Sequence, residues 1–390
     1  MKSSSNLANA FRRNIQTYAI IIALIAIWLF FGFLTDGNYL KPQNFSNIFR
    51  QMTVTGVMAI GMVIVIVTGN IDLSVGKLAG FVSVVVAYFQ AEIWTDVIPD
   101  QAILAATLSI FIGLSVGVLW GVLQGWVISF LNVPSFIVTL GSMFILNGAI
   151  LLVTQGKTIP ANQPGLSYFA QGYLSPIMGW ILAALVVAYL YIHMYRSRAS
   201  KKKHGFELPS MAQDLVMTTF FALLVVGYVF WVNQYNGVQV PVLILAIASV
   251  ILSYMTTNTR FGRYAYAIGG NREAARLSGI NIRNNIFLVF VLMGFLCGVA
   301  GVLLASYVGY GTIAAGQGYE LDVIAAAILG GTSTLGGVGT IWGALIGALI
   351  MSSLSNGLQL MNVAPAWQYA LKGIVLVLAV YADVTFKKRS

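Results

Sequence analysis

The sequence predicts an all-α polytopic membrane protein with about 10–12 transmembrane helices and both termini in the cytoplasm. Composition is the first observation behind this prediction. The chain has 390 residues, of which 58% are hydrophobic and only 8% are charged, and its mean hydropathy is +0.85. So few charges leave too little polar surface to cover a water-soluble protein of this length. Long apolar runs are the second observation, since Tyr18–Leu34 contains no charge at all.

Apolar segments recur along the whole chain and divide it into one transmembrane domain, residues 18–384, between two tails, residues 1–17 and 385–390. A helix needs about 20 apolar residues to cross the bilayer, so the shorter segments are expected to be half-helices or broken helices. The candidate spans are Tyr18–Leu34, Met52–Gly69, Leu73–Gln90, Ala102–Phe130, Phe136–Thr154, Ile177–Tyr195, Leu215–Val232, Val240–Met255, Ile286–Tyr307, Leu321–Gly330, Ile341–Leu354 and Trp367–Ala382.

The position of the basic residues is the third observation. The net charge is +10, which in a soluble protein would suggest nucleic acid as a partner, but sixteen of the 21 Lys and Arg residues lie in four clusters between or beside apolar segments. The positive-inside rule places these clusters in the cytoplasm, so we expect no nucleic-acid partner. Two cytoplasmic loops follow, at residues 196–213 and 257–284. The clusters are Lys2–Arg13, Arg196–Lys203, Arg260–Arg283 and Lys387–Arg389.

Glycine recurs every four residues in two segments and predicts close helix packing. Small residues at this spacing form a flat ridge that lets two backbones approach, which matters in lipid because no hydrophobic effect draws helices together. Packing within the chain is the favoured interpretation, and a seam between two copies is the alternative. The glycines are Gly113, Gly117, Gly121 and Gly125 in the first segment and Gly339, Gly343 and Gly347 in the second.

Two polar, glycine-rich breaks, at residues 67–81 and 329–343, suggest an internal repeat. Interrupted segments in corresponding positions of two halves indicate a transport site. The first break, "GNIDLSVG", contains Asp72, which either caps the next helix or lines a pathway or gate. Other ionisable residues in the spans are Lys77, Asp322 and Lys372, and the last is near enough to a span end to snorkel to the surface. The candidate pathway residues are Asn70, Asp72, Ser74, Ser135, Thr139 and Asn147.

No pattern in the sequence predicts catalysis or a cofactor bound by this chain. His193 and His204 have no cysteine or carboxylate at metal-ligand spacing. The segment "QGKT" has Leu151 where a phosphate-binding loop needs glycine, so the chain is not expected to bind ATP. The single cysteine, Cys297, lies in an apolar run and is expected to be a packing residue.

"GGNREAARLSGI", residues 269–280, predicts a short polar helix in the second cytoplasmic loop. Asn271 is a good N-cap, Glu273 lies in the first turn within reach of Arg276, and Gly279 suits a left-handed stop. Two turns are too short to be stable alone, so the helix must dock against a partner. The partner is either the anionic lipid surface or a groove in a cytoplasmic protein, and the defined caps favour the groove. The segment comprises Asn271, Arg272, Glu273, Ala274, Ala275, Arg276, Leu277 and Gly279.

Four blocks in a fixed order, "GNIDLSVG", "GGNREAARLSGI", "ELDVIAAAILGGTSTLGGVGT" and "KGIVLVLAV", resemble the membrane subunit of bacterial monosaccharide ABC importers. The resemblance runs from about Thr35 to the end of the chain. Within that family, "TDGNYLKPQNFSNIFRQ", "VPSFIVTLG" and "RFGRYAYAIGGNREAARLSGI" look most like the xylose or multiple-sugar branch.

The resemblance implies a homodimer in the inner membrane that imports xylose or a related sugar. A cytoplasmic ATPase subunit, which would carry the ATP and Mg²⁺, would dock on residues 269–280 as a coupling helix, and a periplasmic sugar-binding protein would dock on the other face. Two alternatives come from other classes. One is a secondary transporter driven by an ion gradient, with Asp72 or Asp322 as the ion site, and the other is a membrane scaffold that transports nothing.

Overall fold

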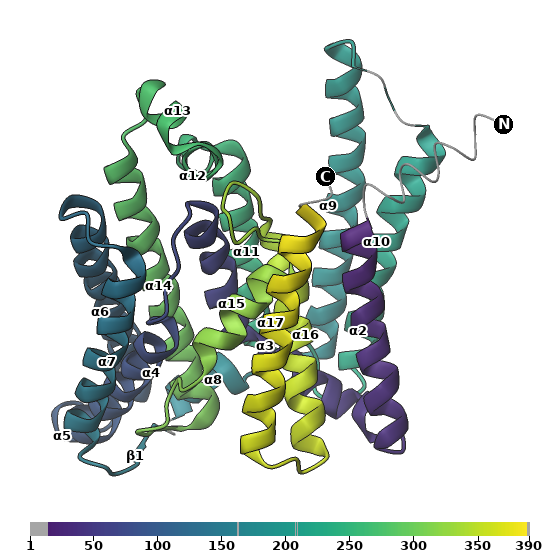
Figure 1. Ribbon diagram of the computed structural model, residues 1–390. Coiled ribbons are helices and arrows are strands. Elements are labelled where there is room, and N and C mark those ends of the chain that lie inside the picture. The colour runs from purple at the N-terminus through teal and green to yellow at the C-terminus, as the bar shows by residue number, and fades with distance from the viewer. Residues whose placement is uncertain (1–14, 162–163, 207, 209, 388–390) are drawn as a thin grey trace.

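The computed structural model describes residues 15–161, 164–206, 208 and 210–387, and this part of the chain folds into a bundle of helices (Figure 1). The remaining residues of the two predicted tails, and most of the first and last basic clusters, lie outside the described residues. Within the described part, ten helical segments are long and apolar enough to cross a membrane. They are α3 (Pro42–Val67), the continuous segment of α4 (Val75–Tyr88), η2 (Phe89–Ile93) and α5 (Trp94–Val97), α6 (Ala102–Phe130), α7 (Ser135–Thr154), α9 (Pro176–Lys203), α10 (Met211–Val232), α11 (Val240–Asn258), α14 (Ile282–Val308), α16 (Ile341–Leu360) and α17 (Pro365–Lys387).

Two of the expected spans are not among these ten. α2 (Ile15–Leu34) has 20 residues, of which Ile20–Leu34 form an apolar stretch, and α15 (Tyr319–Leu329) has only 11. At 1.5 Å per residue α15 is about 16 Å long, which is too short to cross a hydrocarbon core of about 30 Å. The prediction of an all-α bundle of about 10–12 helices with some half-helices is confirmed. The smaller elements are η1 (Asn38–Leu40), α8 (Pro164–Gln171), α12 (Arg260–Gly270), α13 (Arg272–Leu277), and the paired strands β1 (Ile159–Pro160) and β2 (Tyr310–Gly311).

The helices place the basic segments at one end of the bundle. In Figure 1 the start of α2, the end of α9, α12, α13 and the end of α17 all lie at the top, whereas α5 and the β1–β2 pair lie at the bottom. The acidic residues Asp96, in α5, and Asp100, just after α5, lie at the bottom end. The two ends therefore have the opposite charge character that the positive-inside pattern predicts.

One detail of the predicted loops is wrong, and another was not predicted. The cluster Arg196–Lys203 is not part of a loop, because α9 stays helical through Lys203, where three lysines in its last turn complement the helix dipole. Arg198 also pairs with Asp214 of α10, which joins the two helices. In the second loop the sequence predicts only the short helix at 271–279, but Thr259 caps a preceding helix, α12, of 11 residues.

Most of the buried apolar side chains in the core come from α3, α4, α14 and α15. The first glycine ridge lies on α6 and packs directly on α14 of the same chain. A Cβ atom on Gly117 would lie 2.4 Å from the carbonyl oxygen of Gly294, so the two backbones are in contact and no larger residue fits. Cys297, on α14, is a free and fully buried cysteine, as predicted. The geometry therefore has the internal packing that was the favoured interpretation of this ridge.

The second glycine series is only partly a helical ridge. Gly343 and Gly347 lie on α16 and pack against the backbone of α15. Gly339 precedes α16, which begins at Ile341, and contacts Thr332 and Val67 from a loop. The expectation of three glycines on one helix is wrong for Gly339, because the chain is still extended there.

The two glycine-rich breaks lie side by side at the end of the bundle that carries α12. One is the segment from Thr68 to Ser74 between α3 and α4, and the other is residues 330–340 between α15 and α16. The backbone N–H of Gly337 donates a hydrogen bond of 2.9 Å to the carbonyl oxygen of Val67, the last residue of α3. The half-helix α15 thus ends in a loop that is fixed to the end of α3.

Candidate functional site

The short helix α13 has the local chemistry that the sequence predicts. The Asn271 side chain accepts a hydrogen bond of 3.0 Å from the Ala274 N–H, which caps the first turn. Glu273 and Arg276 form an ion pair with a distance of 3.0 Å between Oε2 and Nη2. Gly279 adopts a φ of 78°, and the N–H of Ile280 bonds back to the carbonyl of Ala275, which together form a Schellman stop.

One side of α13 is open. Ala275 is buried against the rest of the chain, whereas Ala274 is exposed and the Leu277 side chain is 82% exposed. The paired side chains of Glu273 and Arg276 are about 70% exposed, at 71% and 68%. Leu277 and the ion pair therefore lie exposed on a helix that stands out from the end of the bundle (Figure 1).

The glycine pair before α13 joins it to the two breaks. Gly269, near the end of α12, lies so close to α3 that a Cβ atom would fall 1.6 Å from the carbonyl oxygen of Val67. Tyr266, one turn earlier, donates a hydrogen bond of 2.7 Å to the carbonyl of Gly339. Burial raises the pKa of the Tyr266 hydroxyl, so the group keeps its proton and remains a donor. The base of α13 is therefore attached to both breaks at once.

Four of the six predicted pathway residues gather at the first break. Asp72 is buried, and its Oδ1 accepts hydrogen bonds from the Ser74 N–H at 2.9 Å and the Ser74 hydroxyl at 2.6 Å. The hydroxyl of Thr139, on α7, reaches the carbonyl of Ile71 at 3.4 Å. Asn70 is half-buried, and its side chain donates to Thr68. The contacts of Asp72 are those of a carboxylate that shapes the local backbone. A pathway role for these four residues stays a prediction.

The other two predicted pathway residues lie elsewhere on α7. Ser135 begins the helix, one turn before Thr139, and Asn147 follows Thr139 by about two turns; both are half-buried. The structure therefore does not bring Ser135 and Asn147 into contact with Asp72.

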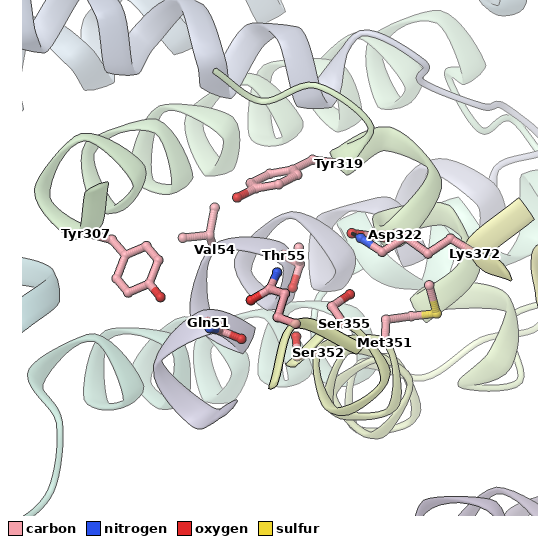
Figure 2. A pocket seen from close by; sticks show the side chains of 11 residues that line it. Gln51, Val54, Thr55, Tyr307, Tyr319, Asp322, Met351, Ser352, Ser355 and Lys372 are labelled. Atoms are coloured by element: carbon pink, nitrogen blue, oxygen red, sulfur yellow. Dashed lines mark hydrogen bonds and ion pairs between the residues drawn. The ribbon is translucent and has the colours of Figure 1, made fainter. Parts of the chain in front are cut away.

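A polar cavity of about 140 Å³ lies in a different place, between α3, α14, α15, α16 and α17. Its residues come from the beginnings of α15 and α17 and from the ends of α14 and α16, so it lies toward the end of the bundle opposite α13. Figure 2 shows the side chains converging on this space. The lining residues are Gln51, Val54, Thr55, Tyr307, Tyr319, Asp322, Met351, Ser352, Ser355, Gln359 and Lys372.

A buried ion pair forms one wall of this cavity. The Lys372 Nζ lies 2.7 Å from the Asp322 Oδ2, and the two side chains are only 15% and 6% exposed. The expectation that Lys372 snorkels to a surface is wrong, because its ammonium group turns inward from α17 to the carboxylate on α15 (Figure 2). Two charges of opposite sign in apolar segments were the only sequence signal for this pair. The polar residues of the cavity carried none.

Among the described residues there is no group of three or more His, Cys, Asp or Glu side chains that could hold a metal ion. With the geometry established, comparison with known proteins decides the family. A family model described as "Branched-chain amino acid transport system / permease component" matches residues 44–380. The chain belongs to this permease family. It is a multi-pass protein of the inner membrane, with most of its helices in the matched region.

Curated members of this permease family resemble the chain over nearly its whole length. It is 39% identical to the xylose transport system permease protein XylH of Haemophilus influenzae, covering 96% of this chain and 98% of that protein. It is 41% identical to XylH of Escherichia coli K12, covering 97% and 94%. It is 32% identical to the ribose import permease protein RbsC of the same strain, covering 93% and 92%. No solved structure gives a significant match.

Proposed function

We propose that this chain is the permease subunit of an ATP-binding-cassette importer that carries xylose or a related monosaccharide across the inner membrane. The observation that carries the proposal is the 39–41% identity to two xylose permeases along nearly the full chain, against 32% to the ribose permease. The difference of seven to nine percentage points at similar coverage favours the xylose branch of the family over the ribose branch.

The proposed assembly needs partners at both ends of the bundle. A cytoplasmic ATPase would supply the energy, a periplasmic binding protein would deliver the sugar at the opposite end, and a second copy of this chain would complete the transport unit. The exposed face of α13 supports the first contact, because Leu277 and the Glu273–Arg276 pair form a preformed apolar and charged surface. The attachment of Gly269 and Tyr266 to the two breaks gives a displacement of α13 a direct mechanical route into the bundle.

Reconstitution tests the proposal and separates it from secondary transport. The chain is placed in proteoliposomes with or without a matching ABC ATPase subunit, a matching binding protein is added outside, and uptake of radiolabelled D-xylose is measured. We expect uptake only when the ATPase and ATP are both present. Uptake by the chain alone along an ion gradient would overturn the proposal.

Charge reversal on α13 tests the docking role. Replacing Arg276 with Glu, or Leu277 with Asp, should reduce ATP-driven uptake about tenfold or more, because like charges or a buried carboxylate at an interface cost several kcal/mol. The chain should remain inserted and keep its thermal stability, since both side chains are exposed. Lys202→Glu, a matched reversal at the end of α9, is the control and should keep uptake. Normal uptake in both α13 variants would show that α13 is not the docking element.

A further inference from the structure

The Asp322 carboxylate has one oxygen that the ion pair does not use. Asp322 is 96% buried, with 4% of its surface exposed, and its Oδ2 bonds to Lys372. Its Oδ1 is buried and has no hydrogen-bond partner among the described residues. A buried carboxylate oxygen without a donor is costly, so this side chain of the cavity wall lacks a hydrogen-bond donor that a bound molecule could supply.

The rest of the cavity wall is rich in neutral hydrogen-bonding groups. Two amides, from Gln51 and Gln359, and two phenols, from Tyr307 and Tyr319, face the same space as the hydroxyl groups of Thr55, Ser352 and Ser355. Figure 2 shows the two tyrosine rings on one side of the space and the serines on the other. The only two formal charges in the wall neutralise each other at 2.7 Å. Such a wall suits a small neutral molecule with many hydroxyl groups.

We propose that this cavity is an aldose-binding site within the permease itself, in which the Asp322 side chain turns so that its unpaired oxygen accepts a hydrogen bond from a sugar hydroxyl. Lys372 holds the carboxylate in place through the ion pair, and Tyr319 and the glutamines supply further donors and acceptors. The site lies toward the end of the bundle opposite α13, where a solute released outside the cytoplasm would enter first. The choice of an aldose as the solute rests on the proposed function.

A branched aliphatic amino acid, the solute class in the description of the family model, fits this cavity less well. Only Val54 and Met351 offer apolar side chains, which is too little to enclose an aliphatic group. A zwitterion would also have to open the Asp322–Lys372 pair to find counter-charges. Amino acids therefore serve as the competing outcome of the test.

The single native cysteine makes the test clean. Cys297 is fully buried and should not react with a water-soluble reagent. A cysteine that replaces Ser355 in the cavity would therefore be the reactive thiol in an otherwise unchanged chain. The full chain carrying Ser355→Cys is reconstituted in nanodiscs without partners. The rate of labelling by a small water-soluble methanethiosulfonate reagent is measured with D-xylose, D-ribose, D-galactose or L-leucine at up to about 100 mM. Thr95→Cys, exposed at the same end of the bundle but outside the cavity, is the matched control.

We expect at least one of the aldoses to slow labelling of Ser355→Cys severalfold while leaving Thr95→Cys unchanged, and leucine to have no effect. When Asp322→Asn is added to Ser355→Cys, the aldose concentration that gives half-maximal protection should rise about tenfold. This is the size of effect expected when a hydroxyl loses a charged acceptor. Tyr319→Phe, which keeps the ring and the ion pair, serves as a second variant where Asp322→Asn does not fold, and should weaken the protection less.

No protection by any aldose, protection by leucine, or protection that is unchanged in both variants would overturn the inference. The proposed function fails separately. ATP-driven xylose uptake without protection of Ser355→Cys would leave the importer intact and remove only this site. An assembly that takes up no monosaccharide would remove the importer, whatever the labelling shows.

Discussion

Asp72 and Asp322 are both buried carboxylates, but the structure holds them in different ways. Asp72 lies in the break between α3 and α4 and accepts both of its hydrogen bonds from Ser74, two residues along the chain. Asp322 lies on the half-helix α15 in the wall of the cavity, pairs with Lys372 from α17, and leaves its second oxygen without a partner. A charge buried in a membrane protein therefore has at least two explanations. We infer that Asp72 shapes the backbone and that Asp322 meets the solute.

Breaking the Asp322–Lys372 pair should have the largest effect. Asp322→Asn leaves a buried ammonium group without a counter-charge, and removing one partner of such a pair costs up to about 3–5 kcal/mol. Adding Lys372→Met removes the unpaired charge and should recover most of the loss. The check is the thermal unfolding midpoint of the purified variants in detergent. Asp214→Asn, which breaks the Arg198–Asp214 pair near the other end, is the control and should cost about 1 kcal/mol or less. If Asp322→Asn unfolds at the wild-type temperature, the ion pair is not a stabilising feature of the core.

Removing the Asp72 carboxylate should have an intermediate and more local effect. Asp72→Ala leaves the N–H and hydroxyl of Ser74 without their acceptor, at a cost of about 1–3 kcal/mol. Asp72→Asn keeps an acceptor oxygen and should cost less. Hydrogen exchange measured by mass spectrometry should show faster exchange in residues 68–78 of the Ala variant. A loss spread evenly over the bundle would contradict a local role.

Replacing Gln124 should have the smallest effect on thermal stability. Its amide donates a hydrogen bond of 2.8 Å to the Ser74 hydroxyl, which in turn donates to Asp72. Gln124→Leu removes this support while Ser74 keeps its bond to the carboxylate, so we expect a loss of about 0.5–1.5 kcal/mol in thermal stability. Combined with Asp72→Ala the losses should be less than additive, because the two side chains support the same serine. Strict additivity would mean that they act independently.

The sequence predicts the long helices and the short helix α13 well because both depend on local rules. Apolar run length determines which segments cross the membrane, and the caps at Asn271 and Gly279 need only their immediate neighbours. The extension of α9 to Lys203 was missed because a run of basic residues predicts a loop in membrane topology, although lysines at a helix end are favourable.

The cavity could not be predicted from the sequence, because its wall combines four C-terminal helices, α14 to α17, with α3 from near the beginning of the chain. Gln51 and Lys372 are separated by more than three hundred residues, and only the folded bundle makes them neighbours. The same limit explains why the predicted pathway centred on "GNIDLSVG". Polar residues close together in sequence are visible, whereas a tyrosine at the end of one helix and a glutamine on another are not. The Asp322–Lys372 pair was accessible only as two unexplained charges.

ATP-driven uptake of D-xylose by two variants of the reconstituted assembly tests the comparison most directly. The first carries Asp322→Asn with Lys372→Met, which keeps the core neutral, and the second carries Asp72→Asn. Our account predicts that the first variant is inserted and stable but takes up xylose roughly tenfold more slowly, whereas the second stays within roughly twofold of the wild-type rate. Wild-type uptake in the first variant, together with loss of uptake in the second, would contradict the account and return the transport site to the break at Asp72.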